Sequence, residues 1–103
     1  MYLDRIGYVG ARAATPETLA GIVAAHTATI AFENLTPLTG ERVRLEPDAL
    51  RDKLVQRHRG GYCFEQNLLL CDELERLGFE PVGLAARVLW NAAGPTARTH
   101  MLV

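Results

Sequence analysis

The spacing of the apolar residues changes once along the chain, near Gly78. Before that glycine, apolar side chains recur three and four residues apart, which is the period of an α-helix with one buried face. After Phe79 the period shortens to two, which indicates a β-strand. The alternating residues are Val82, Leu84, Ala86, Val88 and Trp90. The chain is therefore expected to have an α+β fold, with helices first and antiparallel strands after them.

Start and stop signals divide the helical part into segments. Thr15 followed by Pro16 combines a hydroxyl cap with a proline at the first helical position, so a helix is predicted over residues 16–29. Its apolar stripe consists of Leu19, Ile22, Val23, His26 and Ile30. A shorter helical turn is predicted near the N-terminus, ending at Gly7.

Residues 31–46 contain turn signals and are expected to be irregular. Pro47 opens a further helix that is predicted to continue to Gly60-Gly61, and another helix is predicted from Tyr62 or Cys63 to Gly78. The expected buried positions are Leu50, Leu54 and Val55 in the first of these helices, and Phe64, Leu68, Cys71 and Leu74 in the second. A strand from Phe79, a loop over residues 91–96 and a returning strand over residues 98–103 complete a predicted hairpin.

Composition excludes several classes of function. The chain has 103 residues, of which 49% are apolar and 22% charged, with a net charge of -1, so we expect one soluble domain without a general nucleic-acid surface. Membrane-length apolar runs and an export signal are missing from the sequence, which favours a cytoplasmic protein that does not bind membranes. Basic residues gather at Arg51, Lys53, Arg57, His58 and Arg59. They either attract one anionic ligand or form a solvated helix face.

The stretch that carries chemistry is residues 59–67, RGGYCFEQN. Gly60 and Gly61 allow a sharp turn and a close approach of the backbone, and they deliver Cys63 to the first turn of a helix. The free N–H groups and the positive dipole end there favour the thiolate, and they can stabilise an oxyanion on an acyl carbon. The competing interpretation is that Cys63 is a small buried residue.

A thiol nucleophile needs a base, and three histidines compete for that role. His26 lies on an apolar stripe and is expected to be a satisfied core residue, whereas His58 is expected to face water. His100 lies on the returning strand, which can cross the start of the helix that carries Cys63, so it is the candidate base. Cys71 is expected to be apolar filler, and a disulfide between it and Cys63 is excluded by their helical separation. No close ligand pair of the zinc kind occurs, so no metal is expected.

Residues 59–67 are similar to the active-site signature of the arylamine N-acetyltransferases. Three further segments agree, namely residues 5–8 (RIGY), 32–35 (FENL) and 98–102 (RTHML), and their order and spacing match over essentially the whole chain. The resemblance implies a cysteine-histidine-aspartate triad in which Cys63 and His100 hold the first two positions. One departure is Ala31, where many relatives carry proline.

The resemblance also implies a larger protein, with a helical first domain, a β-barrel second domain and an α/β lid, in a cysteine-protease-like arrangement. On this basis residues 1–78 form the helical domain that carries the nucleophile, and residues 79–103 form the first β-hairpin of an incomplete barrel. The triad aspartate would lie beyond Val103. The aspartates that are not placed to replace it are Asp4, Asp48, Asp52 and Asp72. The chain alone is expected to turn over little, and its unpaired terminal strand could self-associate.

The reaction that the resemblance implies moves an acetyl group from acetyl-coenzyme A to the nitrogen of an arylamine or arylhydrazine, as in xenobiotic metabolism, through an acetyl-cysteine. Residues expected to support the site are Arg5, Glu33, Asn34, Arg59, Gly60 and Gly61, and Phe32 and Tyr62 are expected to contact substrate. Glu33 and Asn34 are hypothesised to bond to Arg59 or Arg5.

Alternative functions stay open at this point. A related amide synthase would receive a long acyl chain on Cys63 and close a macrolactam. A cysteine protease or a transglutaminase-like enzyme would use similar residues. A non-catalytic helical module would keep the core without the reaction.

Overall fold

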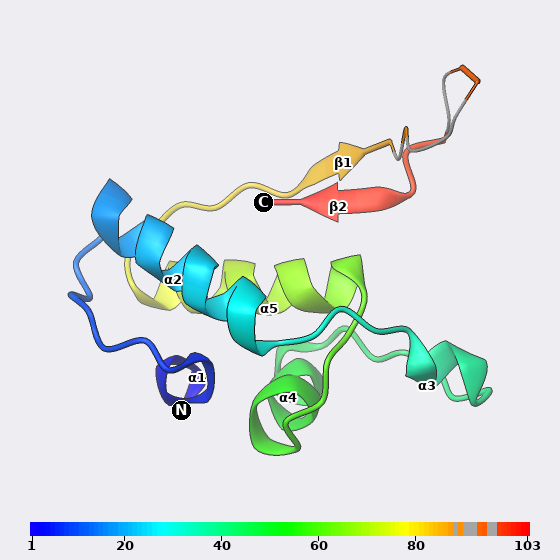
Figure 1. Ribbon diagram of the computed structural model, residues 1–103, viewed down its shortest axis with the longest axis horizontal. Helices are drawn as coiled ribbons and strands as arrows, with labels where there is room; N and C mark the ends of the chain where they lie inside the picture. The colour runs from blue at the N-terminus through cyan, green and yellow to red at the C-terminus, as the bar shows by residue number, and fades with distance from the viewer. Residues whose placement is uncertain (88, 90–92, 95–96) are drawn as a thin grey trace.

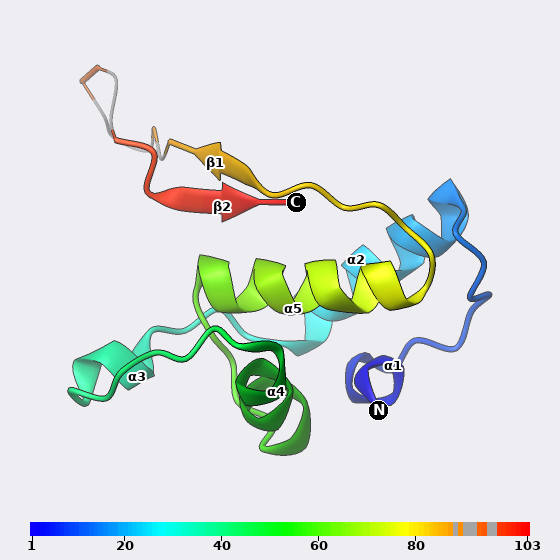
Figure 2. The same cartoon turned by 180° about the vertical axis from the view of Figure 1, so that it is seen from behind.

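The computed structural model describes residues 1–87, 89, 93–94 and 97–103. The elements in chain order are α1 (Tyr2–Ile6), α2 (Pro16–Thr29), α3 (Leu35–Leu38), α4 (Pro47–Leu50), the π-helical segment η1 (Arg51–Gln56), α5 (Cys63–Arg76), β1 (Leu84–Ala86) and β2 (His100–Leu102). Helix α5 lies between the β1–β2 hairpin on one side and α1 and α4 on the other (Figure 1, Figure 2). Helices followed by an antiparallel pair of strands confirm the expected α+β class. Within the described part of the chain, no helix has the length and apolarity that a bilayer crossing requires.

Three helix boundaries follow the sequence signals. Thr15 caps α2, because its hydroxyl oxygen accepts a hydrogen bond from the Thr18 backbone N–H at 3.2 Å, and Pro16 is the first helical residue. Helix α1 ends at Gly7, whose φ of 70° lies in the left-handed region that glycine adopts without a steric penalty. Helix α5 begins at Cys63, as predicted.

The helix that opens at Pro47 does not continue to Gly60-Gly61 as predicted. It is α-helical for one turn, continues as the π-helical segment η1 and ends at Arg57. The chain reverses direction at His58, whose φ of 54° is left-handed, so the helix stops before the glycines. Within η1 three consecutive side chains, those of residues 53–55, are buried. The short helix α3 lies in the stretch that was expected to be irregular.

The two predicted strands form an antiparallel hairpin. Leu84 is paired with Leu102, Ala85 with Met101 and Ala86 with His100. Among the described residues, the strand expected from Phe79 is formed over residues 84–86 and the returning strand over residues 100–102. The predicted strand positions 88 and 90, and residues 91, 92, 95 and 96 of the predicted loop, lie outside the described residues. The domain boundary at residue 78 stays a prediction.

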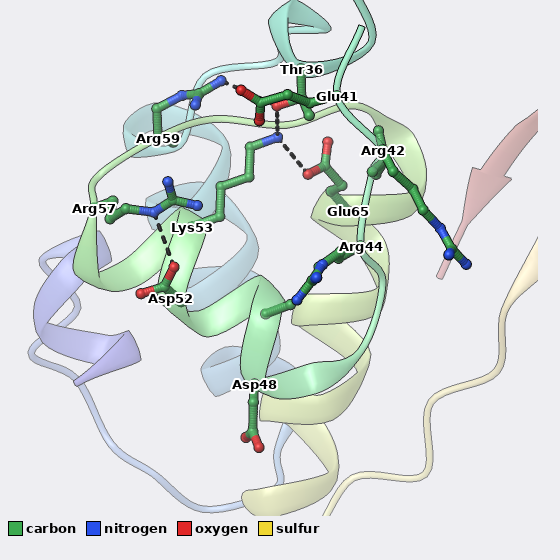
Figure 3. Close-up of a pocket in the computed structure, with 12 residues that line it drawn as sticks. Thr36, Glu41, Arg42, Arg44, Asp48, Asp52, Lys53, Arg57, Arg59 and Glu65 are labelled. Atoms are coloured by element: carbon green, nitrogen blue, oxygen red, sulfur yellow. Dashed lines mark hydrogen bonds and ion pairs between the residues drawn. The ribbon is translucent and has the colours of Figure 1, made fainter.

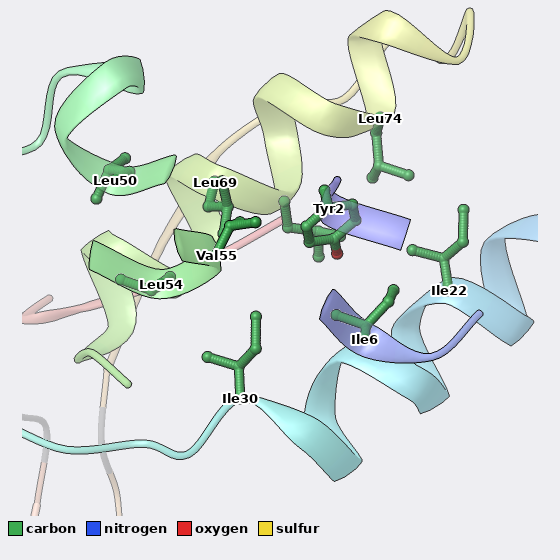
Figure 4. Close-up of a cluster of buried hydrophobic side chains, with 10 residues drawn as sticks. Tyr2, Ile6, Ile22, Ile30, Leu50, Leu54, Val55, Leu69 and Leu74 are labelled. Atoms are coloured by element: carbon green, nitrogen blue, oxygen red, sulfur yellow. The ribbon is translucent and has the colours of Figure 1, made fainter. Parts of the chain in front are cut away.

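The hydrophobic core lies between α1, α2, α4, η1 and α5 (Figure 4). Its buried members are Tyr2, Ile6, Ile22, Ile30, Leu50, Leu54, Val55, Leu69, Leu70 and Leu74. The predicted stripe of α2 is correct at Ile22, His26 and Ile30 but wrong at Val23, which is exposed. The stripe of α5 is correct at Leu74, but the other buried leucines of this helix are Leu69 and Leu70 rather than Leu68. The reason is that α5 has two apolar sides, and Phe64 and Leu68 on the other side are only partly buried, facing the hairpin.

Replacement of Leu69 by alanine tests the core. Leu69 is 1% exposed and its loss leaves a cavity, so Leu69→Ala is expected to lower the free energy of unfolding of the full-length protein by about 2–5 kcal/mol. Leu38→Ala is the matched control, because Leu38 is 74% exposed and its loss should change stability by at most about 0.5 kcal/mol. Urea unfolding followed by circular dichroism measures both, and equal effects would contradict this assignment of the core.

Candidate active site

Cys63 is the first residue of α5, and its side chain is 5% exposed. The two glycines before it are required for space. A Cβ atom on Gly60 would lie 2.8 Å from Glu33 Cγ and closer still to the Ala31 carbonyl oxygen, and one on Gly61 would lie 2.7 Å from Glu65 Cβ. The predicted close approach is therefore correct. The left-handed turn, in contrast, falls at His58 and not at either glycine.

A short backbone pairing fixes the turn that precedes Cys63. The Gly61 N–H donates to the Ala31 carbonyl oxygen at 3.2 Å, and the Glu33 N–H donates to the Gly61 carbonyl oxygen at 3.0 Å. These bonds form a parallel bridge between Phe32 and Gly61. The loop after α2 therefore holds the turn from one side, and this loop contains the motif of residues 32–35.

Glu65 braces the turn from within α5. Its Oε1 accepts a hydrogen bond from the Tyr62 N–H at 3.2 Å, and its Oε2 accepts one from Lys53 Nζ at 2.7 Å. Lys53 Nζ also donates to Thr36 Oγ1 at 2.7 Å, so α3, η1 and α5 meet at one ammonium group (Figure 3). Glu65 is 1% exposed and Lys53 is buried, which makes this a buried ion pair.

The basic cluster around residue 55 is thus only partly a solvated face. Arg57 and His58 are exposed, as that interpretation expected, and Arg57 pairs with Asp52 at 3.0 Å. Lys53 contradicts it, because its ammonium is buried against Glu65. Arg51 is also partly buried and pairs with Asp72 and Glu73 of α5.

Gln66 binds the other side of the same turn. Its side-chain N–H groups point at the carbonyl oxygens of Ala31, at 2.8 Å, and Gly61, at 3.2 Å, while its Oε1 lies 2.6 Å from His26 Nε2. His26 Nδ1 lies 2.7 Å from the Tyr2 hydroxyl. His26 is therefore the satisfied interior residue that its place on the apolar stripe predicted. Burial lowers the pKa of His26, and the nearby charge of Arg5 lowers it further, against the opposing effect of the Gln66 hydrogen bond.

Asn67 connects the nucleophile helix to the hairpin. Its Nδ2 donates to the Cys63 carbonyl oxygen and to the Met101 carbonyl oxygen, each at 2.9 Å. Met101 directly follows His100, the first residue of β2. One carboxamide therefore joins the two segments that carry the candidate nucleophile and the candidate base.

His100 is half-buried and lines an open groove between α5 and the hairpin, of about 440 Å³. The groove is formed by Phe64, Leu68, Gly83, Leu84, Ala85, Arg98, His100 and Met101. Most of these side chains are apolar, so the groove suits an apolar or aromatic group. Between the two candidates themselves, both of which the structure describes, no hydrogen bond is formed.

The hypothesised bonds of Glu33 and Asn34 to arginine are half correct. Glu33 Oε2 accepts a hydrogen bond from Arg59 Nη2 at 3.2 Å, so this half of the hypothesised pairing is present. The other half is absent from the described residues, because Asn34 is exposed and its side chain bonds to neither arginine. Arg5 instead donates from Nε to the Leu54 carbonyl oxygen at 2.8 Å.

The two residues expected at the substrate differ in their surroundings. Phe32 is 66% exposed. The Tyr62 ring lies with its centroid 5.6 Å from that of Phe64, which lines the groove. Burial raises the pKa of Tyr62, and negative charge on Cys63 and Glu65 raises it further.

Sequence reasoning missed the bracing residues Lys53 and Gln66 and the role of Asn67. A signal existed for Lys53, because Leu50, Lys53 and Leu54 recur at the i, i+3 and i+4 positions of one helix face. Such a lysine on an apolar stripe needs a buried carboxylate partner. For Gln66 and Asn67 the signal was their place in the signature of residues 59–67, three and four positions after Cys63.

Residues 15–103 match the family model described as N-acetyltransferase. The chain therefore belongs to the arylamine N-acetyltransferase family, as the signature around Cys63 predicted.

Several relatives named arylamine N-acetyltransferase are similar to this chain. The arylamine N-acetyltransferase of Mycobacterium tuberculosis is 50% identical over 99% of this chain, and that of Escherichia coli is 41% identical over 99%. The solved structure of the Mycobacterium marinum enzyme superposes with a TM-score of 0.92 at 51% identity over 97% of this chain. A structure of that enzyme in complex with CoA has a TM-score of 0.89. The chain spans 38% of the length of the M. tuberculosis and M. marinum proteins.

The buried ion pair can be tested against an exposed one. Lys53→Met leaves the Glu65 carboxylate buried without its ammonium partner, so it is expected to lower the free energy of unfolding by about 3–5 kcal/mol. Arg57→Met breaks the exposed pair with Asp52 and should cost at most about 1 kcal/mol. Urea unfolding of the two full-length variants measures the difference, and a Lys53→Met protein as stable as Arg57→Met would contradict the buried pair.

The close approach at Gly60 gives a second test. Gly60→Ala forces Cβ against the Ala31 carbonyl, which is backbone and cannot move aside, so stability should fall by about 1–3 kcal/mol. Gly94→Ala is the control, because a Cβ there meets nothing within 4 Å. Thermal unfolding of both variants measures the effect, and an unchanged midpoint for Gly60→Ala would show that the loop after α2 does not constrain the turn.

Proposed function

We propose that the protein transfers an acetyl group from acetyl-coenzyme A to the nitrogen of an arylamine or arylhydrazine, with the acetyl group carried on Cys63 between the two half-reactions. Family membership supports acetyl transfer in general. The observation that carries the assignment to Cys63 is its position as the first residue of α5, behind a turn braced by Glu65, Gln66 and the Ala31 carbonyl.

In the first half-reaction the Cys63 thiolate attacks the carbonyl carbon of the thioester. A new carbon–sulfur bond to Cys63 forms, the bond to coenzyme A breaks, and coenzyme A leaves as a thiol after gaining the proton that His100 took from Cys63. The start of α5 supplies the positive end of the helix dipole, which favours the thiolate and the oxyanion of the tetrahedral intermediate. The M. marinum relative, whose structure contains CoA, supports coenzyme A as the carrier of the acetyl group.

In the second half-reaction the amine nitrogen attacks the acetyl-cysteine. The bond from the acetyl carbon to Cys63 breaks, the sulfur leaves as a thiolate, and His100 accepts the proton that the amine loses. The apolar groove beside His100 suits the aromatic ring of such an amine, with Tyr62 and Phe32 as further contacts.

The complete catalytic unit is proposed to include parts outside these 103 residues. A triad aspartate would orient the His100 imidazole and stabilise its charged form. The β-barrel of the cysteine-protease-like arrangement, which the hairpin of residues 79–103 would begin, and the lid would enclose the site. We place the protein in the cytoplasm, in the metabolism of foreign amines, and expect the 103-residue chain alone to turn over little.

Replacing each of the two cysteines by serine tests the proposal. When the full-length protein is incubated with acetyl-coenzyme A, Cys63→Ser is expected to lose both the covalent acetyl group and turnover. Cys71→Ser is the control, because Cys71 is half-buried on α5 and burial raises the pKa of its thiol, which disfavours the reactive thiolate. Intact-protein mass spectrometry and an arylamine assay follow the two readouts. Acetylation of the Cys63→Ser protein at the wild-type level would exclude Cys63 as the carrier.

A further inference from the structure

A chain of hydrogen bonds, buried at Tyr2 and His26 and partly exposed at Gln66, runs from the N-terminal helix to the turn before Cys63. It begins at the Tyr2 hydroxyl in α1, passes through the His26 imidazole in α2 at 2.7 Å and reaches the Gln66 carboxamide in α5 at 2.6 Å. Gln66 then donates to the carbonyl oxygens of Ala31 and Gly61. Tyr2 and His26 are both buried, so water does not replace these partners.

The acceptors at the end of the chain fix the proton positions along it. Carbonyl oxygens only accept, so the N–H end of the Gln66 amide must face Ala31 and Gly61, and its oxygen must face His26. His26 Nε2 therefore donates, and in a neutral imidazole Nδ1 is left to accept from the Tyr2 hydroxyl. Each group in the chain is satisfied by this single arrangement.

We propose that Gln66 and His26 are positioning residues for acyl transfer, because they hold the Gly61 peptide and thereby the direction in which Cys63 leaves the turn. The inference rests on the proposed function of Cys63. Gln66 lies one helical turn after Cys63, and Gly61 lies two residues before it, so the carboxamide ties the start of α5 to the strand-like turn that leads into it. His26 acts through Gln66, since its Nε2–H donates to the amide oxygen and holds the carboxamide in the orientation that the Ala31 and Gly61 carbonyls require.

The neutral state of His26 is part of this arrangement. A protonated imidazole would donate from both nitrogens, so the Tyr2 hydroxyl would have to turn and accept, and the buried charge would face Arg5 of α1. The charged and titratable groups around the chain are Tyr2 and Arg5 from α1 and Glu73 from α5. Burial lowers the pKa of His26 and raises that of Tyr2, with Glu73 raising the latter further, and both shifts favour the neutral side chains.

The sign of the pH effect follows from the lowered pKa. The unfolded chain binds a proton at His26 near the ordinary value of about 6.5, and the folded chain does so only at lower pH. The contribution of His26 is thus fully present above about pH 6.5 and is lost as the pH falls through the folded value. Positioning of Cys63 should weaken over the same range.

Gln66→Met tests the carboxamide. Methionine has a similar length and cannot bond to Gly61, so acetylation of Cys63 by acetyl-coenzyme A in the full-length protein should slow by about 10- to 100-fold, as expected for a displaced nucleophile. Gln56→Met makes the same chemical change at the exposed end of η1 and should leave the rate unchanged. Single-turnover mass spectrometry gives the rates, and circular dichroism shows whether each variant is folded.

His26→Gln tests the imidazole without removing its hydrogen bond. A glutamine amide can donate to Gln66 Oε1 but does not titrate, so the variant should acetylate Cys63 within about threefold of the wild-type rate at neutral pH and lose less rate as the pH is lowered below about 6.5. His26→Leu should resemble Gln66→Met. His58→Asn is the control, because His58 is exposed and asparagine tolerates its left-handed φ.

The outcomes distinguish a failure of this inference from a failure of the proposed function. A folded Gln66→Met protein that acetylates Cys63 at the wild-type rate overturns the inference, and so does a His26→Gln protein with an unaltered pH profile. If Gln66→Met does not fold, the His26→Gln pH profile decides. If the wild-type protein transfers no acetyl group, the proposed function fails. The rate of Cys63 alkylation by iodoacetamide then decides the inference, which an equal rate in wild type and Gln66→Met would overturn.

Discussion

The geometry around Cys63 depends on one short backbone pairing, between the loop after α2 and Gly61. The Gly61 peptide is bonded at both its N–H and its carbonyl, to Ala31 and Glu33 respectively. This pairing leaves no room for a side chain on Gly60, whose Cα lies against the Ala31 carbonyl. Helix α5 can begin at Cys63 only because the preceding residues are held in this extended pairing. The glycine pair is therefore a packing requirement at the contact between two loops.

Polar groups, rather than apolar ones, complete the clamp. Burying Lys53 and Glu65 has a desolvation cost of several kcal/mol per ion, which their hydrogen bonds offset only in a narrow geometry. An apolar contact tolerates small displacements, whereas an ion pair whose carboxylate also accepts from the Tyr62 N–H does not. Gln66 has the same property on the other side of the turn. The directional bonds thus converge on residues 61 and 62, immediately before the nucleophile.

The sequence predicted the features whose causes are local. Two adjacent residues, Thr15 and Pro16, are enough to mark the start of α2. The start of α5 at Cys63 follows from the glycine pair. The burial of Lys53 was not predicted, because its partners Thr36 and Glu65 lie in other elements. The helical period of a sequence shows which face of a helix is buried. It does not show which polar group from another element that face contacts.

The same limit explains the other differences between expectation and structure. The Arg59 N–H donates to the Lys53 carbonyl oxygen across the left-handed turn at His58, and neither histidine nor its neighbours signal this turn in the sequence. Family resemblance supplied what local patterns lacked, since it singled out residues 32–35 and 98–102 before their contacts with the Cys63 segment were known. It identified Glu33 as a partner of Arg59 but misassigned Asn34 and Arg5.

Cys63 and His100 are held by different kinds of structure. Cys63 is fixed by a helix start, a loop pairing and two side-chain braces, all within the helical layer. His100 lies on a two-stranded hairpin, which is marginal by itself and needs packing against a helix or further strands. Here α5 provides that packing. Asn67 aligns the hairpin with α5, because its amide group donates to the carbonyl oxygens of both Met101 and Cys63. The nucleophile is therefore preorganised by its own layer, while the position of the base depends on how firmly the hairpin is held to α5.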